Sequence, residues 1–145
     1  MRALLPNSAW SAVEAHARQG YPHEICGVLL GRAGDPLRIQ EAHPCANRNT
    51  ERAQDRYLID PLQQMRFERD GRRRGLDVVG YFHSHPDHPA VPSVTDLELS
   101  WENLLYLIVS LRDGKVVEAK AWVRPSGQKN FEEVALEALA EGQKV

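Results

Sequence analysis

The chain has 145 residues, with 18 Lys and Arg against 20 Asp and Glu, a formal net charge of −2 and 42% hydrophobic residues. This length predicts one domain, residues 1–145, that can bury a sizeable core without disulfides. The near-zero net charge provides no basic field for a phosphate backbone, so nucleic acid is not an expected partner. The longest apolar run, Leu104–Val109, is far shorter than the roughly 20 residues of a membrane-spanning helix. Because Met1–Pro6 also breaks before forming a secretory signal, we expect a soluble, cytoplasmic protein.

The first half of the chain is predicted to hold one helix and three strands. Apolar residues recur at helical spacing over residues 7–19, and glycine and proline follow directly as a stop signal. The apolar run 25–30 predicts a buried strand, and the alternation over 37–40 predicts its half-exposed partner. Residues 44–55 are polar and aperiodic, which predicts a long loop before a short strand at 57–59.

The second half is predicted to contain three helices, an apolar strand and a hairpin. Asp60 as cap and Pro61 as first helical residue predict a helix that runs to about residue 74. The further elements are a strand over 78–83, a proline-rich loop over 86–92, a helix from Ser93 to Glu102, a hairpin of 104–111 with 116–123, and a last helix over Phe131–Ala140. Strands and helices in this mixture predict an α/β (α+β) fold, a mixed β-sheet flanked by helices.

Two histidines at the end of the apolar strand are candidate metal ligands. Side chains alternate along a strand, so His83 and His85 are expected to point the same way. Ser93 and Asp96 form a Ser-x-x-Asp pair, which predicts a helix capping box and also offers a carboxylate. Two imidazoles and one carboxylate leave one open position on a tetrahedral Zn²⁺, as catalytic zinc sites do. Glu24, just before a buried strand, is the candidate base, although an acidic residue there is more often simply solvated.

Two other metal-site classes share parts of this pattern. Residues 83–88 spell His-x-His-x-Asp-His, which resembles the signature of metallo-β-lactamase-like hydrolases. Those enzymes need histidine ligands further along the chain, and none follows His88, so Asp87 and His88 are left as loop residues without a role. A non-haem Fe(II) oxygenase also uses two histidines and a carboxylate, but usually within a jelly roll, which the predicted helices argue against.

The complete pattern resembles the JAMM (MPN+) metalloprotease motif. It reads His83-x-His85-x7-Ser93-x2-Asp96, with Glu24 upstream in Glu-Ile-Cys-Gly. The resemblance implies an MPN-type fold in which His83, His85 and Asp96 hold one Zn²⁺ with a water. It further implies that Glu24 is the general acid and base and that Ser93 hydrogen-bonds the developing oxyanion.

The compact chain resembles stand-alone prokaryotic JAMM proteins, in particular the sulfur-carrier-protein–cysteine hydrolases. The resemblance implies cleavage of the amide or isopeptide bond after the C-terminal Gly-Gly of a ubiquitin-like or sulfur-carrier protein. An extended tail of this kind can add beside a sheet edge, and loops 44–55 and 86–92 are expected to line its channel. The leaving group, a cysteine or a lysine side chain of a target protein, stays open at this point, as does the oligomeric state. A deconjugating isopeptidase is the alternative, and a non-catalytic MPN scaffold is disfavoured because every ligand position is kept.

The two cysteines and an arginine run are expected to have structural rather than catalytic roles. Cys26 and Cys45 form no Cys-x-x-Cys pair, and a small cysteine in a buried strand is more often packing than nucleophile. The run Arg72–Arg74 is interleaved with upstream acidic residues and is expected to be a solvated helix end, with docking of an acidic protein surface as the alternative.

Overall fold

The structure is a computed structural model that describes residues 1–139. Its elements in chain order are β1 (Arg2–Pro6), α1 (Asn7–Gly20), β2 (Cys26–Arg32), β3 (Leu37–Cys45), α2 (Pro61–Arg73), β4 (Asp77–Pro86), α3 (Val94–Glu98), β5 (Leu105–Arg112), β6 (Lys115–Val123) and β7 (Glu132–Leu139). Within this range, no helix has both the length and the apolar character needed to span a membrane.

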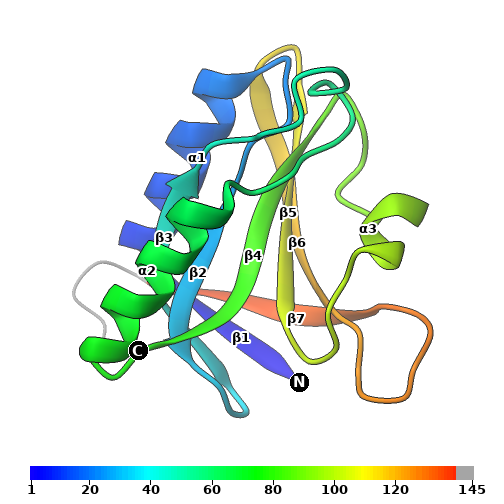
Figure 1. Cartoon of the computed structure of the whole chain (residues 1–145). Helices are drawn as coiled ribbons and strands as arrows, with labels where there is room; N and C mark the ends of the chain where they lie inside the picture. Colours follow the sequence, from blue (N-terminus) through cyan, green and yellow to red (C-terminus); the bar gives the residue numbers. More distant parts are fainter. Residues whose placement is uncertain (140–145) are drawn as a thin grey trace.

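The strands form one closed sheet in the order β1-β3-β2-β4-β5-β6-β7, with β7 pairing back onto β1. β1 runs parallel to both of its neighbours, and β4 runs parallel to β5, whereas the remaining neighbours are antiparallel. The predicted mixed sheet with flanking helices is therefore confirmed. Figure 1 shows α1 and α2 on one side of β4 and α3 on the other.

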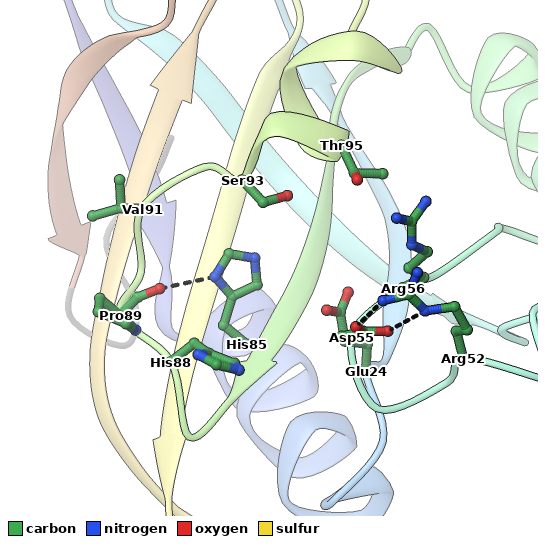
Figure 2. Close-up of a pocket in the computed structure, with 10 residues that line it drawn as sticks. All are labelled: Glu24, Arg52, Asp55, Arg56, His85, His88, Pro89, Val91, Ser93 and Thr95. Carbon is green, nitrogen blue, oxygen red and sulfur yellow. Dashed lines mark hydrogen bonds and ion pairs between the residues drawn. The ribbon is translucent and has the colours of Figure 1, made fainter.

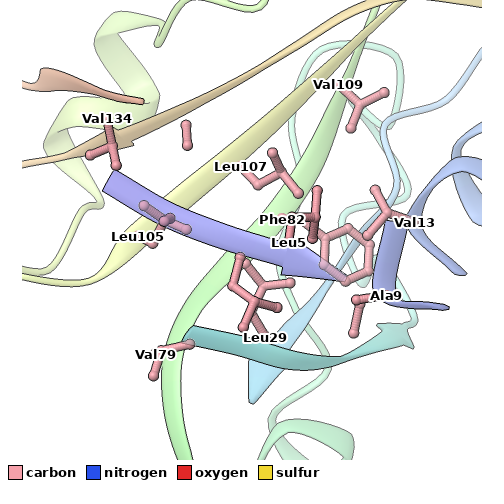
Figure 3. Close-up of a cluster of buried hydrophobic side chains, with 14 of the residues drawn as sticks. Leu5, Ala9, Val13, Leu29, Val79, Phe82, Leu105, Leu107, Val109 and Val134 are labelled. Atoms are coloured by element: carbon pink, nitrogen blue, oxygen red, sulfur yellow. The ribbon is translucent and has the colours of Figure 1, made fainter. Parts of the chain in front are cut away.

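Alternating residues of β2 pack into two separate cores. Leu29 joins Phe82 and the apolar face of α1 in the larger core, which Figure 3 shows beneath β1. Val28 packs instead in a smaller cluster with Tyr81 of β4, and Phe67 of α2 lies against that cluster. The two cores fix β2 and β4 as the rigid centre of the sheet, and the candidate ligands lie at the end of β4.

The predicted helix over Phe131–Ala140 is wrong for the residues that the structure describes, and Ala140 lies outside them. Residues Glu132–Leu139 form β7, which pairs antiparallel with β6 and parallel with β1. The Ala-, Leu- and Glu-rich segment has high helix propensity, but propensity is a weak preference that pairing on both edges overrides. Val134 is buried in the larger core while Ala135 is exposed, as expected for a strand.

Other elements differ from expectation mainly in their ends. β1, which is five residues long, was not predicted. Of the predicted strand at 57–59, only Ile59 forms a bridge, to Asn47. The helix expected from Ser93 to Glu102 ends at Glu98, and the strand that starts at Leu37 continues to Cys45.

Candidate active site

The end of β4 brings the two predicted histidine ligands together. His83 and His85 are both buried, and their Nε2 atoms lie 3.2 Å apart. His85 Nδ1 lies 2.8 Å from the carbonyl oxygen of Pro89, which orients its ring so that Nε2 faces His83. A backbone carbonyl on the second ring nitrogen is the usual way in which proteins orient a metal-ligating histidine.

The capping box of α3 positions the third ligand. Ser93 Oγ accepts the backbone N–H of Asp96 at 3.0 Å, and Asp96 Oδ2 accepts the backbone N–H of Ser93 at 2.8 Å. This reciprocal pair turns the Asp96 carboxylate toward β4, where Oδ1 lies 3.2 Å from His83 Nε2 and Oδ2 lies 3.1 Å from His85 Nε2. The Ser-x-x-Asp pair is thus a helix cap and a source of a candidate metal ligand at the same time.

The spacing of these three groups fits a zinc ion. Their donor atoms lie within 4.8 Å of one another, and the closest separations are 3.1–3.2 Å. Two ligands of a tetrahedral Zn²⁺, each about 2.0–2.1 Å from the metal, lie roughly 3.3 Å apart. Two imidazole nitrogens and a carboxylate oxygen are also a normal donor set for a zinc site with an open position. The residues present therefore fit this ion.

Glu24 is held beside this group by bonds to two neighbouring segments. Ile25 N–H donates to Ser84 Oγ at 2.9 Å, and Ser84 N–H donates to Ile25 O at 3.1 Å, so the residue between the two histidines ties the start of β2 to β4. On the other side, Asn47 Nδ2 donates to Glu24 O at 3.0 Å. These backbone and side-chain hydrogen bonds together place the buried Glu24 beside the C-terminal end of β4.

Glu24, His85 and Ser93 line one pocket of about 350 Å³. Figure 2 shows His85, Ser93 and Val91 along one side of this pocket and Glu24 with Asp55 along the other. Loops 44–55 and 86–92 both contribute lining residues, as predicted for the channel walls. A base candidate, a hydroxyl group and a metal-ligand candidate thus line one pocket.

Residues 6–125 match the family model described as prokaryotic homologs of the JAB domain. The chain belongs to this family. It is 37% identical to the desampylase of Haloferax volcanii over 126 residues, covering 83% of this chain and 88% of the relative. It is 36% identical to the CysO-cysteine peptidase of Mycobacterium tuberculosis, covering 71% of this chain and 69% of the relative.

Solved structures agree with this membership of a compact prokaryotic JAMM/MPN group. The solution structure of protein DSY2949 from Desulfitobacterium hafniense superposes with a TM-score of 0.81 at 33% identity, covering 97% of this chain and 94% of that one. The JAB1/MPN domain protein AF2198 from Archaeoglobus fulgidus gives a TM-score of 0.58 at 20% identity, covering 96% and 99%, and shows the shared fold alone.

The surroundings of the site shift the pKa values of His83 and Asp96 for different reasons. Burial holds the pKa of His83 below its ordinary value, which favours the neutral imidazole that a metal requires. Burial alone would raise the pKa of Asp96, but the bonds to His83 and His85 outweigh it and hold that pKa well below its usual range. The bonds to the two histidines therefore favour the carboxylate form of Asp96.

Glu24 is shifted in the opposite direction. Burial raises its pKa to about 8, and repulsion from the Asp96 and Asp55 carboxylates adds to the effect against the opposing charges of His85 and Arg56. A carboxyl group whose pKa lies near neutrality exchanges a proton readily at physiological pH, which is what a general acid and base needs. Glu24 thus combines a position in the pocket with a raised pKa.

Several positioning residues were missed by the sequence interpretation. The Tyr57 ring stacks on His83 with centroids 4.5 Å apart and planes 24° apart. Within residues 1–139, His83 Nδ1 has no hydrogen-bond partner. The ring of His83 is therefore oriented by stacking on Tyr57, whereas the ring of His85 is oriented by its hydrogen bond with Pro89 O. Asn47 and Ser84 hold Glu24 as described above. An aromatic beside the predicted loop was visible in the sequence, but its contact with β4 depends on the fold.

The remaining features of the sequence have structural positions without a catalytic contact. Cys26 and Cys45 face each other in the β2–β3 pair, and burial raises their thiol pKa values to about 12 and about 11, which fits inert packing groups. Asp87 accepts the Tyr21 hydroxyl at 2.6 Å, while His88 lines the pocket. In the arginine run, Arg72 pairs with Glu68 and Arg74 with Glu41 and Asp70.

Proposed function

We propose that this chain is a zinc-dependent metallopeptidase that hydrolyses the amide or isopeptide bond after the C-terminal Gly-Gly of a ubiquitin-like or sulfur-carrier protein. One observation carries the proposal: the His83, His85 and Asp96 donor atoms converge at zinc-ligand spacing beside a pocket that also holds Glu24. A scaffold that only binds partners has no need for this convergence. In this proposal residues 1–145 act as one domain.

His83, His85 and Asp96 are the residues that would hold the ion. The chemistry that Zn²⁺ supplies when bound is a lowered pKa for a coordinated water and polarisation of the scissile carbonyl. Ser93 Oγ already accepts the N–H of Asp96, so its hydroxyl hydrogen is available to donate to the oxygen of that carbonyl as negative charge develops on it. His83 and His85 are themselves buried, whereas Ser93 is exposed at the pocket.

Glu24 would move the protons of the reaction. Its carboxylate takes a proton from the attacking water, whose oxygen bonds to the glycine carbonyl carbon. As the C–N bond breaks, the same carboxyl group gives that proton to the departing amine nitrogen. A pKa raised to about 8 suits a group that must accept and then donate one proton in each cycle.

The relatives support the substrate class. Those above 30% identity include a desampylase and a CysO-cysteine peptidase, and a further relative at 30% identity is named a probable TtuB-protein conjugate cleaving protease of Thermus thermophilus. The pocket is consistent with it, because loops 44–55 and 86–92 both line the pocket and a glycine tail without side chains needs little width. A small protein ending in Gly-Gly is therefore the proposed partner.

The proposal is tested by metal analysis together with a cleavage assay. Purified protein is expected to contain one zinc per chain and to release the group attached to a Gly-Gly-ending carrier, detected by mass spectrometry of the intact carrier. His85→Ala is expected to lose both zinc and cleavage. Wild-type protein without stoichiometric zinc would favour the scaffold, and iron in its place would favour the oxygenase.

A further inference from the structure

The active-site pocket is lined by a positively charged side chain, Arg56, that has no role in the proposed reaction. Arg56 lines the same pocket as Glu24, His85 and Ser93, and it also lines a narrower extension of that pocket beside Asp96. Its side chain is partly buried. Figure 2 shows it on the same side of the pocket as Glu24.

Arg56 differs from its neighbour in having no acidic partner. The Arg52 guanidinium forms a bidentate ion pair with Asp55, which satisfies its charge within the protein. Within residues 1–139, no carboxylate oxygen lies within 4.0 Å of the Arg56 guanidinium. A partly buried guanidinium that lines a pocket and forms no direct ion pair there provides a binding site for an anion on the substrate.

The backbone of Arg56 is fixed relative to the reacting groups. Asn47 Nδ2 donates to Arg56 O and to Glu24 O, both at 3.0 Å, so one side-chain amide holds the two residues together. Arg56 N–H also donates to Arg52 O at 2.8 Å. The backbone that carries the Arg56 side chain is therefore tied to the same amide as the backbone of Glu24.

The two sides of the scissile bond differ in what they can offer this cation. The Gly-Gly tail on the acyl side carries only uncharged peptide groups. On the amine side, a free α-amino acid places its carboxylate one carbon from the scissile nitrogen. A lysine side chain of a target protein has only methylene groups near that nitrogen, and its own carboxyl group is tied up in a peptide bond.

We propose that Arg56 binds the α-carboxylate of the leaving group, so that the bond cleaved joins the Gly-Gly end of the carrier to a free α-amino acid. This inference rests on the proposed function and narrows its substrate class. Arg56 is then a specificity-determining residue. Isopeptide-linked proteins, which lack the carboxylate, are poorer substrates.

The test uses three forms of one sulfur-carrier protein that ends in Gly-Gly. The first carries a C-terminal cysteine, the second carries cysteinamide in its place, and the third is joined to the Nε atom of Nα-acetyl-lysine amide. The cysteine and cysteinamide substrates differ only in whether the leaving group carries a carboxylate. For the zinc-loaded wild-type protein, kcat/KM is expected to be about tenfold or more higher for the acid than for the amide, as expected for a charge-assisted contact.

Arg56→Gln is expected to remove this preference by lowering kcat/KM on the acid alone, with zinc content and thermal stability unchanged. Arg56→Lys, which keeps a charge but loses the bidentate fork, is expected to retain part of the preference. Equal wild-type rates on acid and amide would overturn the inference. A loss of equal size on all substrates in Arg56→Gln would also overturn it, because it would show that Arg56 acts through the charge of Glu24.

The outcomes also separate this inference from the proposed function. Cleavage of all three substrates at similar rates leaves the metallopeptidase intact and refutes only the role of Arg56. Cleavage of none of them by zinc-loaded wild-type protein refutes the proposed function, and the inference with it.

Discussion

At the scale of single residues, the two candidate histidine ligands are oriented by different means. His85 has a backbone carbonyl on its second nitrogen, whereas His83 has the Tyr57 ring stacked on its face. Tyr57→Phe is expected to keep the stack and the zinc affinity. Tyr57→Ala is expected to lower that affinity about tenfold, within the usual range for groups that support metal ligands. Competition with a zinc chelator measures both variants, and wild-type affinity in Tyr57→Ala would contradict the assignment.

Ser93 is expected to act twice, as helix cap and as hydrogen-bond donor to the substrate. Ser93→Ala removes both contributions, so activity should fall about 10²–10³-fold and stability by about 1 kcal/mol. Ser93→Gly is the matched variant, because glycine at a helix cap costs only a few tenths of a kcal/mol. Both variants should be equally slow in the cleavage assay, but only Ser93→Ala should unfold at clearly lower denaturant. Near-wild-type cleavage by either would exclude the hydroxyl from the reaction.

The candidate site was largely predictable from the sequence, whereas its supports were not. His83 and His85 were predicted from strand alternation. The capping-box spacing predicted that Asp96 could be both a helix-cap residue and a candidate metal ligand. Glu24 was a weak candidate from spacing alone and entered through the resemblance to a family. Asn47, Tyr57 and Arg56 lie on a loop whose path depends on contacts with β2 and β4, and no local pattern encodes such contacts.

At the scale of elements, β7 shows where local preference fails. The segment Glu132–Leu139 has the composition of a helix, yet β1 and β6 offer it two open edges, and pairing with both closes the sheet. β1 was missed for a different reason, because a five-residue segment has too little pattern to be recognised. Ser-x-x-Asp and the apolar run in β4 were recognised because each signal lies within a few residues of sequence.

The strand assignment of β7 predicts opposite responses at neighbouring positions. Val134 is 2% exposed and packs in the larger core, whereas the side chain of Ala135 is exposed. Val134→Asp is expected to lower the free energy of unfolding by about 3–5 kcal/mol, because it leaves a buried charge without a partner. Ala135→Asp is expected to change it by less than about 1 kcal/mol. Urea denaturation measures both, and similar losses at the two positions would contradict the alternation.

At the scale of the whole molecule, an ion pair joins the end of α2 to the sheet. Arg74 at the C-terminus of α2 donates to both carboxylate oxygens of Glu41 on β3, at 2.5 and 2.8 Å. The hydrogen bonds from Arg74, aided by His43, outweigh partial burial and lower the pKa of Glu41 to about 2. In the unfolded chain a glutamate titrates near its ordinary pKa of about 4.3.

This difference sets the sign of a pH effect on stability. A depressed carboxyl pKa stabilises the folded state above about pH 4.3, and the contribution disappears as the pH falls toward 2. Glu41→Gln is therefore expected to be less stable than wild type at pH 7, with the gap shrinking in acid. The control Glu68→Gln breaks an exposed 3.5 Å pair with Arg72 and should change little at either pH. Thermal melts from pH 7 to pH 3 measure the difference in stability between wild type and Glu41→Gln. A difference that grows as the pH falls would contradict the account.

The central claim is that Glu24 moves the protons of a hydrolysis at a site built by His83, His85 and Asp96. The most direct measurement compares wild type and Glu24→Gln for zinc content and for cleavage of a carrier extended by cysteine after its Gly-Gly. Glu24 is not a ligand in this account, so the variant should keep one zinc per chain and lose at least about 10²-fold in kcat/KM. A Glu24→Gln protein that binds zinc and cleaves at the wild-type rate would contradict the claim.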